Sequence, residues 1–372
     1  MSAAIERLLA YQIEARHTPG ALVHVERGGM LLARAAAGLL GPGSQEAMHD
    51  DALFRLASLT KPVVSLAALM QVEQGLLELD APLAGYLPAM RDLCLLGGVA
   101  PSRPPTLRDL LRHTSGFAYE TEFREAAQRE IALKDDFGAR MPYVAADDFL
   151  ARLAVRPLAA EPGRAFRYGY STDVLGQIVA AADGASLGEV LRRRIFEPLG
   201  MSQTGFEVPA AEHGRLAAAF AADSAWHARV PGYGLRREGR PWMECGGAGL
   251  VSTLDDFARF ARMIARGGRH GDTRLISESL FVEMTRNQLP EDVDGPLGFT
   301  GAGFGFGLGF AVRLDYGAPA MPCAPGELTW SGISGTALFV HPGEQWFALC
   351  FSSNMASRMM ARMEFRRAVA QV

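Results

Sequence analysis

The sequence predicts an α+β fold, an α/β sandwich in which an antiparallel β-sheet is flanked by terminal helices and carries an inserted, mostly helical lobe. Three observations predict it: β-rich segments occur near both ends of the chain, helix-capping signals recur through its middle, and helical patterns open and close it. The simplest packing joins the strands of both ends into one sheet. We therefore expect residues 1–80 and 305–372 to form a sheet lobe and residues 81–304 a helical lobe. A cleft between two lobes is a common ligand site, and we expect the functional site there.

Size and composition are those of a globular protein. The chain has 372 residues, more than one small core usually serves, and its 49% hydrophobic and 21% charged residues are ordinary proportions. A net charge of −4 argues against a nucleic-acid partner. No apolar run reaches the length of about 18 residues that spans a membrane, and the N-terminal run is too short and interrupted for a signal peptide. We expect a cytoplasmic protein with no membrane partner, and the sequence carries no signal for an oligomeric state.

The metal-ligating residue types do not form a recognisable site. The four cysteines lie far apart and none forms a CxxC pair; they are Cys94, Cys245, Cys323 and Cys350. This spacing favours reduced, structural cysteines over a zinc site or a disulfide framework. The eight histidines are scattered, and none has the H-E-x-x-H spacing of a zinc protease. We therefore expect no metal and no cofactor.

The first elements follow from hydrophobic patterning. In "MSAAIERLLAYQIEARHTPG", Ile5, Leu9 and nearby apolar residues share one helical face, which predicts an amphipathic helix. Two apolar runs flank Arg27-Gly28-Gly29, the signal of a β-hairpin. Residues 59–74 are apolar nearly all round and predict a buried helix, which Gly75 is placed to end.

The middle and the C-terminal part differ in pattern. Three Ser or Thr residues precede an acidic residue at capping-box spacing: Thr106 with Asp109, Ser186 with Glu189, and Thr253 with Asp256. From about residue 305, short β-rich segments bounded by Gly, Pro or Asn predict strands: "FGLGFAVRLD", "GELTW", "GTALFVHP" and "WFALCFSSN". A last helix is expected over about 356–371.

The stretch "RLASLTKP" places Ser58 and Lys61 three residues apart, on one face of the predicted buried helix. Burial and the helix dipole both disfavour the ammonium form of the lysine, and a neutral lysine could take the serine proton. The Ser58 N–H, free at the helix start, could help stabilise an oxyanion. Pro62 disfavours helical geometry at the residue before it, so we expect an irregular first turn. S-x-x-K alone is a short pattern, and a capping serine beside a surface lysine is the alternative.

Two further stretches are candidates. Tyr168 and Tyr170 lie in the loop before a helix that begins near Ser171, and a loop tyrosine near a lysine can act as a general acid or base. In "TWSGISGTALFV", Trp330-Ser331-Gly332 leads into a strand whose backbone can approach a ligand closely. Each has a structural alternative: a tyrosine packed on a helix start, and a strand edge after a glycine turn. His113, in "LLRHTSGF", is predicted to fix the turn after its helix.

Taken in order, these motifs resemble the serine β-lactamase-like superfamily, which includes penicillin-binding proteins, class C β-lactamases and related esterases. Within it, the chain is most similar to the family VIII carboxylesterases. The matching stretches include "RLASLTKPVVSLAALMQVEQGLLELDAPLAGYLP", "LRDLLRHTSGFAYE", "PGRAFRYGYSTDVLG", "CGGAGLVSTLDDFARF" and "LTWSGISGTALFVHP", and they extend from about residue 51 to 342. The resemblance implies a β-lactamase/transpeptidase-like fold.

The resemblance also implies roles for individual residues. Ser58 would be the acylated nucleophile and Lys61 its basic partner. Spacing from "DVLG" selects Tyr168 over Tyr170 as the motif tyrosine. The backbone N–H groups of Ser58 and Ile333 would form the oxyanion hole.

The expected substrate-binding residues are Tyr119, Tyr170, Trp330 and Gly332. Trp330 stands where many relatives have a lysine, and it cannot make a charged contact with a carboxylate. Tyr170 stands where class C lactamases have asparagine. Both departures favour a neutral ester.

The sequence therefore predicts a serine carboxylesterase for short- to medium-chain esters, with a small-molecule ester as its substrate. A β-lactamase, a D-amino-acid peptidase or an acyltransferase with the same residues is the first alternative. A non-catalytic binding module of the same fold is the second. Trp330 and the Phe-rich segment near residue 304 could also be core residues only.

Overall fold

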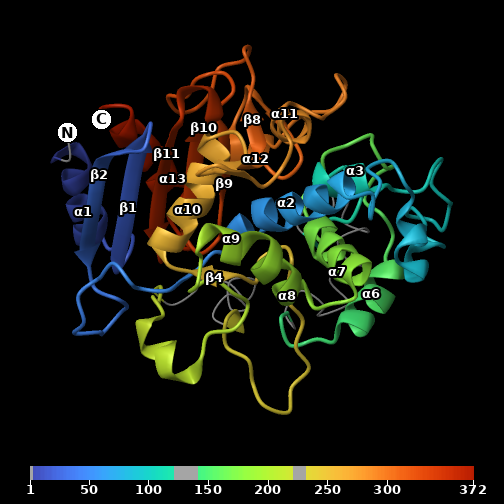
Figure 1. Ribbon diagram of the computed structural model, residues 1–372, viewed down its shortest axis with the longest axis horizontal. Helices are drawn as coiled ribbons and strands as arrows, with labels where there is room; N and C mark the ends of the chain where they lie inside the picture. The colour runs from blue at the N-terminus through green and yellow to red at the C-terminus, as the bar shows by residue number, and fades with distance from the viewer. Residues whose placement is uncertain (1–2, 121–140, 221–231) are drawn as a thin grey trace.

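Both ends of the chain build one antiparallel sheet. The computed structural model describes residues 3–120, 141–220 and 232–372 (Figure 1). In this part of the chain the main sheet has the strand order β2-β1-β11-β10-β9-β8-β7. The strands are β1 (Gly20–Arg27), β2 (Met30–Gly38), β7 (Phe304–Phe306), β8 (Ala311–Arg313), β9 (Leu328–Ser331), β10 (Ala337–His341) and β11 (Trp346–Ser352). The predicted N-terminal hairpin thus pairs with the last strand, which confirms the α+β fold.

The two faces of the sheet belong to two separate apolar clusters. Along β1, Leu22 faces one cluster and Val23 the other, because successive side chains of a strand point to opposite faces. Their partners on β11, Phe351 and Cys350, follow the same alternation. The sheet therefore needs helices on both sides.

The terminal helices α1 (Ala3–Glu14) and α13 (Arg358–Val369) cover one face, where Ile5, Leu9 and Phe365 are buried together. Helix α10 (Leu254–Ala265) covers the other face and lies in front of the sheet in Figure 1. The Phe257 ring of α10 lies 5.7 Å from the ring of Phe351. The flanking terminal helices are as predicted.

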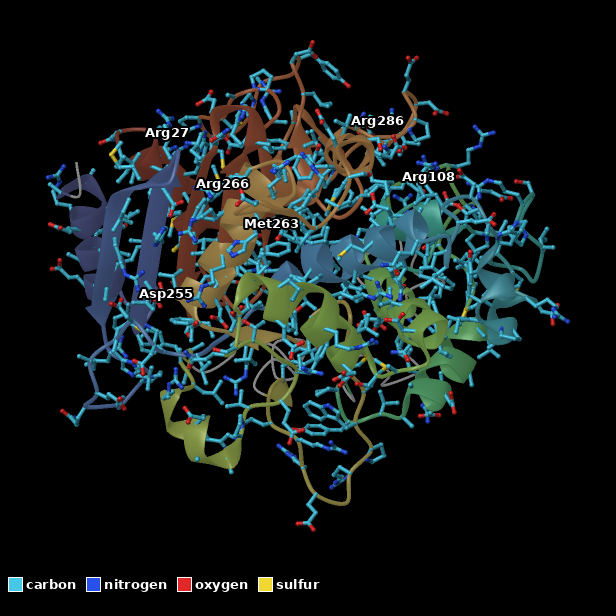
Figure 2. The ribbon with its side chains drawn as sticks, in the orientation of Figure 1. Arg27, Arg108, Asp255, Met263, Arg266 and Arg286 are labelled. Atoms are coloured by element: carbon cyan, nitrogen blue, oxygen red, sulfur yellow. The ribbon has the colours of Figure 1, made fainter. Side chains whose placement is uncertain are left out.

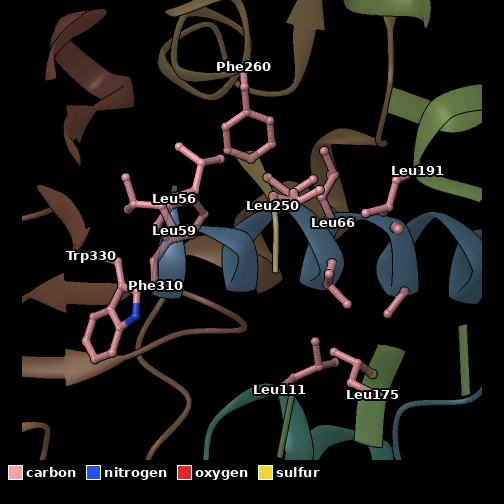
Figure 3. Close-up of a cluster of buried hydrophobic side chains, with 14 of the residues drawn as sticks. Leu56, Leu59, Leu66, Leu111, Leu175, Leu191, Leu250, Phe260, Phe310 and Trp330 are labelled. Atoms are coloured by element: carbon pink, nitrogen blue, oxygen red, sulfur yellow. The ribbon is translucent and has the colours of Figure 1, made fainter. Parts of the chain in front are cut away.

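Helix α2 (Thr60–Glu73) is the centre of the larger cluster. Figure 3 shows it between Phe260 on one side and Leu111 and Leu175 on the other. It is buried nearly all round, as its sequence predicts, and Gly75, with φ 72°, follows its end. The remaining helices are α3 (Leu107–Leu111), α6 (Ala146–Ala154), α7 (Ser171–Asp183), α8 (Leu187–Leu191), α9 (Glu197–Leu199), α11 (Glu278–Thr285) and α12 (Leu297–Thr300).

Capping follows the predicted spacing in all three cases. Thr106 and Asp109 form a reciprocal capping box at α3. The side chains of Ser186 and Thr253 each accept a hydrogen bond from the N–H three residues on. These bonds satisfy N–H groups that a helix start leaves without partners.

Between α3 and α11, an ion-pair network joins segments far apart in the sequence. Arg108 donates to Asp80 and Glu283, each at 2.8 Å (Figure 2). Arg286 also binds Glu283. Two short antiparallel pairs complete the fold: β3 (Phe54–Arg55) with β4 (Val251–Ser252), and β5 (Arg269–His270) with β6 (Thr273–Arg274). The division into a sheet lobe and a helical lobe stays a prediction.

None of the four cysteines, which all lie in the described part of the chain, forms a disulfide bond. Within the described ranges, no single helix has the length and apolarity needed to cross a membrane. Helix α7 together with the helical segment 187–199, at a bend of 76°, passes that test as a pair.

Candidate active site

Ser58 lies in a short 3₁₀ turn, η1 (Ala57–Leu59), that leads directly into α2. The predicted irregularity falls before Lys61 rather than at it, because Ala57 has a φ of 47° and the α-helix already runs from Thr60. A positive φ is unfavourable for a residue with a Cβ atom and occurs mainly where surrounding contacts impose it. Such contacts are present: the Leu56 N–H donates to Leu250 O at 2.8 Å. The turn therefore holds the half-buried Ser58 against the sheet.

Lys61 is a buried amine directed at Ser58. Its side chain is 1% exposed, and its Nζ lies 3.3 Å from Ser58 Oγ. The same Nζ donates to the carbonyl oxygen of Gly247 at 2.7 Å. No carboxylate among the described residues forms an ion pair with it. A nucleophile and a base within hydrogen-bond reach are the arrangement that activates a serine.

Gly247 is a part of the site that the sequence did not single out. Its N–H donates to Asp173 Oδ1 at 2.9 Å, and a Cβ atom here would lie 2.5 Å from Asp173 Oδ2. The buried Asp173 therefore fixes the carbonyl that accepts from Lys61. The glycine-rich stretch "CGGAGL" is the signal that could have found it.

Tyr168 lies beside Lys61. Lys61 Nζ lies 4.6 Å from the centroid of the Tyr168 ring and 5.9 Å from that of Tyr119. The Tyr119 N–H donates to Tyr168 O at 3.0 Å, and the Tyr170 N–H donates to Phe117 O at the same distance. These two hydrogen bonds pair the loop of Tyr119 with the loop of Tyr168, and Gly169 lies in close contact between them. The pairing brings the rings of Tyr119 and Tyr168 to Lys61.

Tyr170 has a different environment. It is fully buried, and its hydroxyl donates to Glu120 Oε1 at 3.0 Å. Glu120 is in turn paired with Arg156 at 3.0 Å. The structure therefore brings Tyr119 and Tyr168 to Lys61, whereas the Tyr170 hydroxyl is engaged by a buried ion pair. A role for Tyr170 in substrate binding stays a prediction.

Trp330 lies near the start of α2 (Figure 3). Its ring packs beside that of Tyr168. It is 2% exposed, and its ring contacts those of Tyr168, Phe299 and Phe306 at 5.3–5.7 Å. The buried Trp330 Nε1 has no hydrogen-bond partner in the described part of the chain. The ring is part of the apolar core next to the site.

Gly332 permits a close approach between the third motif and the Ser58 turn. Its N–H donates to Thr336 O at 2.7 Å, and a Cβ atom would lie 2.3 Å from the carbonyl oxygen of Leu56. Only glycine fits this contact without displacing backbone. Ile333 is the next residue after Gly332, so its N–H lies one residue beyond this contact with the Ser58 turn. An oxyanion hole formed by the N–H groups of Ile333 and Ser58 stays a prediction.

His113 lies behind Tyr168, with its ring centroid 4.8 Å away. Burial, and then the charge of Lys61, hold the pKa of His113 well below its usual value of 6.5. Its carbonyl accepts from the Arg167 N–H at 2.8 Å, so it connects the turn after α3 to the loop that carries Tyr168. Among the described residues, no group of three or more His, Cys, Asp or Glu side chains could hold a metal ion.

Comparisons with known proteins agree with this geometry. A family model described as Beta-lactamase matches residues 4–371. Esterase EstB of Burkholderia gladioli is 32% identical over 91% of this chain and 87% of its own. Lovastatin esterase of Penicillium rubens is 32% identical over 78% of this chain and 79% of its own. The solved structure of "EstCE1, a hydrolase with promiscuous acyltransferase activity" superposes with a TM-score of 0.84 at 26% identity, covering 98% of this chain and 97% of its own. The predicted resemblance is confirmed, and the chain belongs to the Beta-lactamase family.

Proposed function

We propose that this protein is a serine carboxylesterase that cleaves short- to medium-chain carboxylic esters through an acyl-enzyme on Ser58. The observation that carries the proposal is the buried Lys61 Nζ at 3.3 Å from Ser58 Oγ. Two relatives, EstB and lovastatin esterase, are named as esterases, and the structural neighbour EstCE1 is a hydrolase. These relatives support ester hydrolysis by this branch of the family.

In the first step, Ser58 Oγ attacks the ester carbonyl carbon while its proton passes to Lys61 Nζ. The carbonyl oxygen becomes an oxyanion, which the N–H groups of Ser58 and Ile333 stabilise. Tyr168, beside Lys61, gives its hydroxyl proton to the alkoxide as the carbon–oxygen bond breaks and takes the Ser58 proton from Lys61 in exchange. The products are a free alcohol and an ester between the acyl group and Ser58.

In the second step, water attacks the acyl-enzyme and gives one proton to Tyr168, whose own hydroxyl proton passes to Lys61. The same oxyanion hole holds the tetrahedral intermediate. Its collapse returns the proton to Ser58 Oγ and releases the carboxylic acid. Proton transfer by positioned side chains contributes roughly 10²- to 10⁴-fold to such steps.

The apolar surroundings support a neutral substrate. Trp330 and Phe299 pack against Tyr168, where a charged third-motif residue would otherwise bind a carboxylate. An alcohol can replace water in the second step, so acyl transfer is the second candidate function; the neighbour EstCE1 has promiscuous acyltransferase activity. Relative turnover of an ester, a cephalosporin and a D-alanyl amide distinguishes an esterase or acyltransferase from a β-lactamase or a D-amino-acid peptidase. Cytoplasmic location stays part of the proposal.

The first experiment is intact-mass analysis after incubation with a fluorophosphonate, together with hydrolysis of p-nitrophenyl butyrate. We expect one adduct and ester turnover for the wild type, and neither for Ser58→Ala. Ser65→Ala, which removes the hydroxyl of a buried serine seven residues further along, in α2, is the control and should still form the adduct. If the folded wild type forms no adduct, the esterase proposal fails and a non-catalytic binding module is favoured.

A further inference from the structure

An apolar cavity of about 390 Å³ lies next to the segment that carries Ser58. Its lining is largely hydrophobic and includes Phe54, Leu216, Phe220, Leu235 and Met355. Alanines of the segment before Phe220 complete one wall. Concave apolar sites of this size are typical of small-molecule binding.

The cavity is lined by residues that lie close in sequence to each of the two residues of the proposed oxyanion hole. Arg55, three residues before Ser58, and Ser334, directly after Ile333, both line it. Ser334 Oγ donates to the carbonyl oxygen of Arg55 at 2.6 Å, which joins the two segments at the cavity wall. A substituent on a carbonyl carbon bound at the Ser58 and Ile333 N–H groups is therefore a short distance from this space.

A second cavity, of about 470 Å³, lies on the Tyr168 side of the site. Its lining includes Phe166 and Phe299 and the charged residues Asp292 and Asp294. The Phe299 ring is 4.7 Å from that of Tyr168. The two cavities thus differ in polarity and flank different catalytic groups.

The positions of the two cavities indicate where each substituent of the ester carbonyl, the alkoxide and the acyl chain, would lie. The leaving alkoxide must lie where Tyr168 can protonate it, which is the side of the second, charged cavity. The acyl chain then extends to the opposite side, toward Arg55 and Ser334. We propose that the 390 Å³ apolar cavity binds the acyl chain and that the enzyme prefers unbranched aliphatic acyl groups longer than acetyl. This inference rests on the proposed esterase function.

The cavity size sets the expected chain-length response. A water molecule takes about 30 Å³ of liquid volume, so an acetyl group leaves most of the 390 Å³ unfilled. Each further methylene moved from water into an apolar space should raise kcat/KM about fourfold until the cavity is full. The wild type should therefore favour longer p-nitrophenyl esters over the acetate.

The experiment measures kcat/KM for p-nitrophenyl acetate, butyrate, hexanoate and octanoate, which share one leaving group. Ala219→Leu places a larger side chain in the cavity wall and so reduces the cavity volume. It should lower the ratio of kcat/KM for octanoate to kcat/KM for acetate at least tenfold. Met355→Ala widens the cavity and should move the preferred chain to greater length. Ala211→Leu, the same substitution on an exposed residue outside the cavity, is the matched control and should keep the wild-type ratio.

A second series varies the alcohol of butyrate esters at constant acyl length. Neither cavity variant should change the preference in this series. If Ala219→Leu changes the alcohol preference and not the acyl preference, the assignment of the cavity is overturned. If folded variants keep the wild-type acyl profile while Ser58 still forms its adduct, the inference is wrong and the esterase function stands. If the wild type forms no adduct and cleaves no ester, both fail.

Discussion

Arg362 donates from Nη1 to Ser331 Oγ at 2.7 Å, and from Nη2 to the carbonyl oxygen of Phe299. Arg362 is 5% exposed, and no acidic side chain in the described part of the chain pairs with it. Burial, and then the like charge of Arg358, lower the pKa of Arg362 to about 10. A buried charge without a counter-charge is costly. The Arg362 guanidinium joins the segment of Phe299 to that of Ser331. The rings of Phe299 and of Trp330, the neighbour of Ser331, pack against Tyr168.

We expect Arg362→Met to lower activity without lowering stability. Loss of the two hydrogen bonds allows the segments of Phe299 and Ser331 to shift. A displacement of about 1 Å in the side chains that position a catalytic group can lower the rate roughly 100-fold. We expect kcat to fall at least tenfold. The free energy of unfolding should stay within about 1 kcal/mol of wild type or rise, because replacing an uncompensated buried charge by an apolar side chain is often neutral or stabilising. Ester kinetics and urea unfolding measure the two effects.

Arg366→Met is the control, four residues along the same helix. Arg366 makes two bonds to the buried Glu327, at 2.9 and 2.7 Å. Its removal leaves an unpaired buried carboxylate, which should cost about 3–5 kcal/mol of stability. If Arg362→Met loses as much stability as Arg366→Met, or keeps full activity, a positioning role for Arg362 is excluded.

Sequence reasoning predicted the elements that local chemistry determines. Gly28 and Gly29 adopt positive φ in the hairpin turn, and Gly75 does so after α2. The Thr106 and Asp109 cap also depends on four consecutive residues. Such signals need no knowledge of the remaining chain, because the interacting groups are neighbours in sequence.

The contacts that complete the site are of another kind. Ser58 and Lys61 are a local pair, three residues apart, so their spacing made them candidates in the sequence. The carbonyl that accepts from Lys61 belongs to Gly247, 186 residues away. The bond between Arg362 and Ser331 spans 31 residues. No periodicity or turn signal encodes such pairings, since they arise only when the sheet and the helices have packed.

The two motif tyrosines should respond differently to loss of the hydroxyl. Tyr168→Phe should lower kcat about 10²- to 10⁴-fold with little change in stability, because in the proposed reaction its hydroxyl transfers protons. Tyr170→Phe removes the hydrogen bond to Glu120 and should cost about 1–3 kcal/mol of stability. Its loss in kcat should be at least tenfold smaller than that of Tyr168→Phe. The reverse order of kcat values would make Tyr170 the motif tyrosine.

Substitution of Gly332 should disrupt the contact between the third motif and the Ser58 turn. In Gly332→Ala, the new Cβ would lie 2.3 Å from both Leu56 O and Thr336 Oγ1, so backbone must move. We expect kcat to fall about 100-fold or more, since the next residue, Ile333, is the proposed oxyanion donor. Gly85→Ala is the control, because open space surrounds that position. It should leave kcat unchanged and raise stability by at most about 1 kcal/mol. Equal kcat values for the two variants would exclude a steric requirement at Gly332.

The buried histidines should make the fold acid-sensitive. Burial, and then the charge of Lys61, lower the pKa of His113 well below 6.5, and burial also lowers that of His24. Below pH 6.5 the unfolded chain therefore binds protons that the folded chain does not, so stability falls as the pH falls. Above pH 6.5 neither state binds these protons, and this contribution is constant.

The expected effect of His113 is a loss of about 1.4 kcal/mol between pH 7.5 and 5.5, the value of one proton over one pH unit below the ordinary pKa. His113→Asn removes this proton site and tolerates the positive φ of 57° at that position. The variant should be less stable at pH 7.5, because a packed ring is lost, yet its stability should fall less on acidification than that of the wild type. His24 and the carboxylates act equally in both proteins and cancel in the difference. Urea unfolding at the two pH values measures this difference. An identical loss of stability on acidification in both proteins would mean that the pKa of His113 is not lowered in the fold.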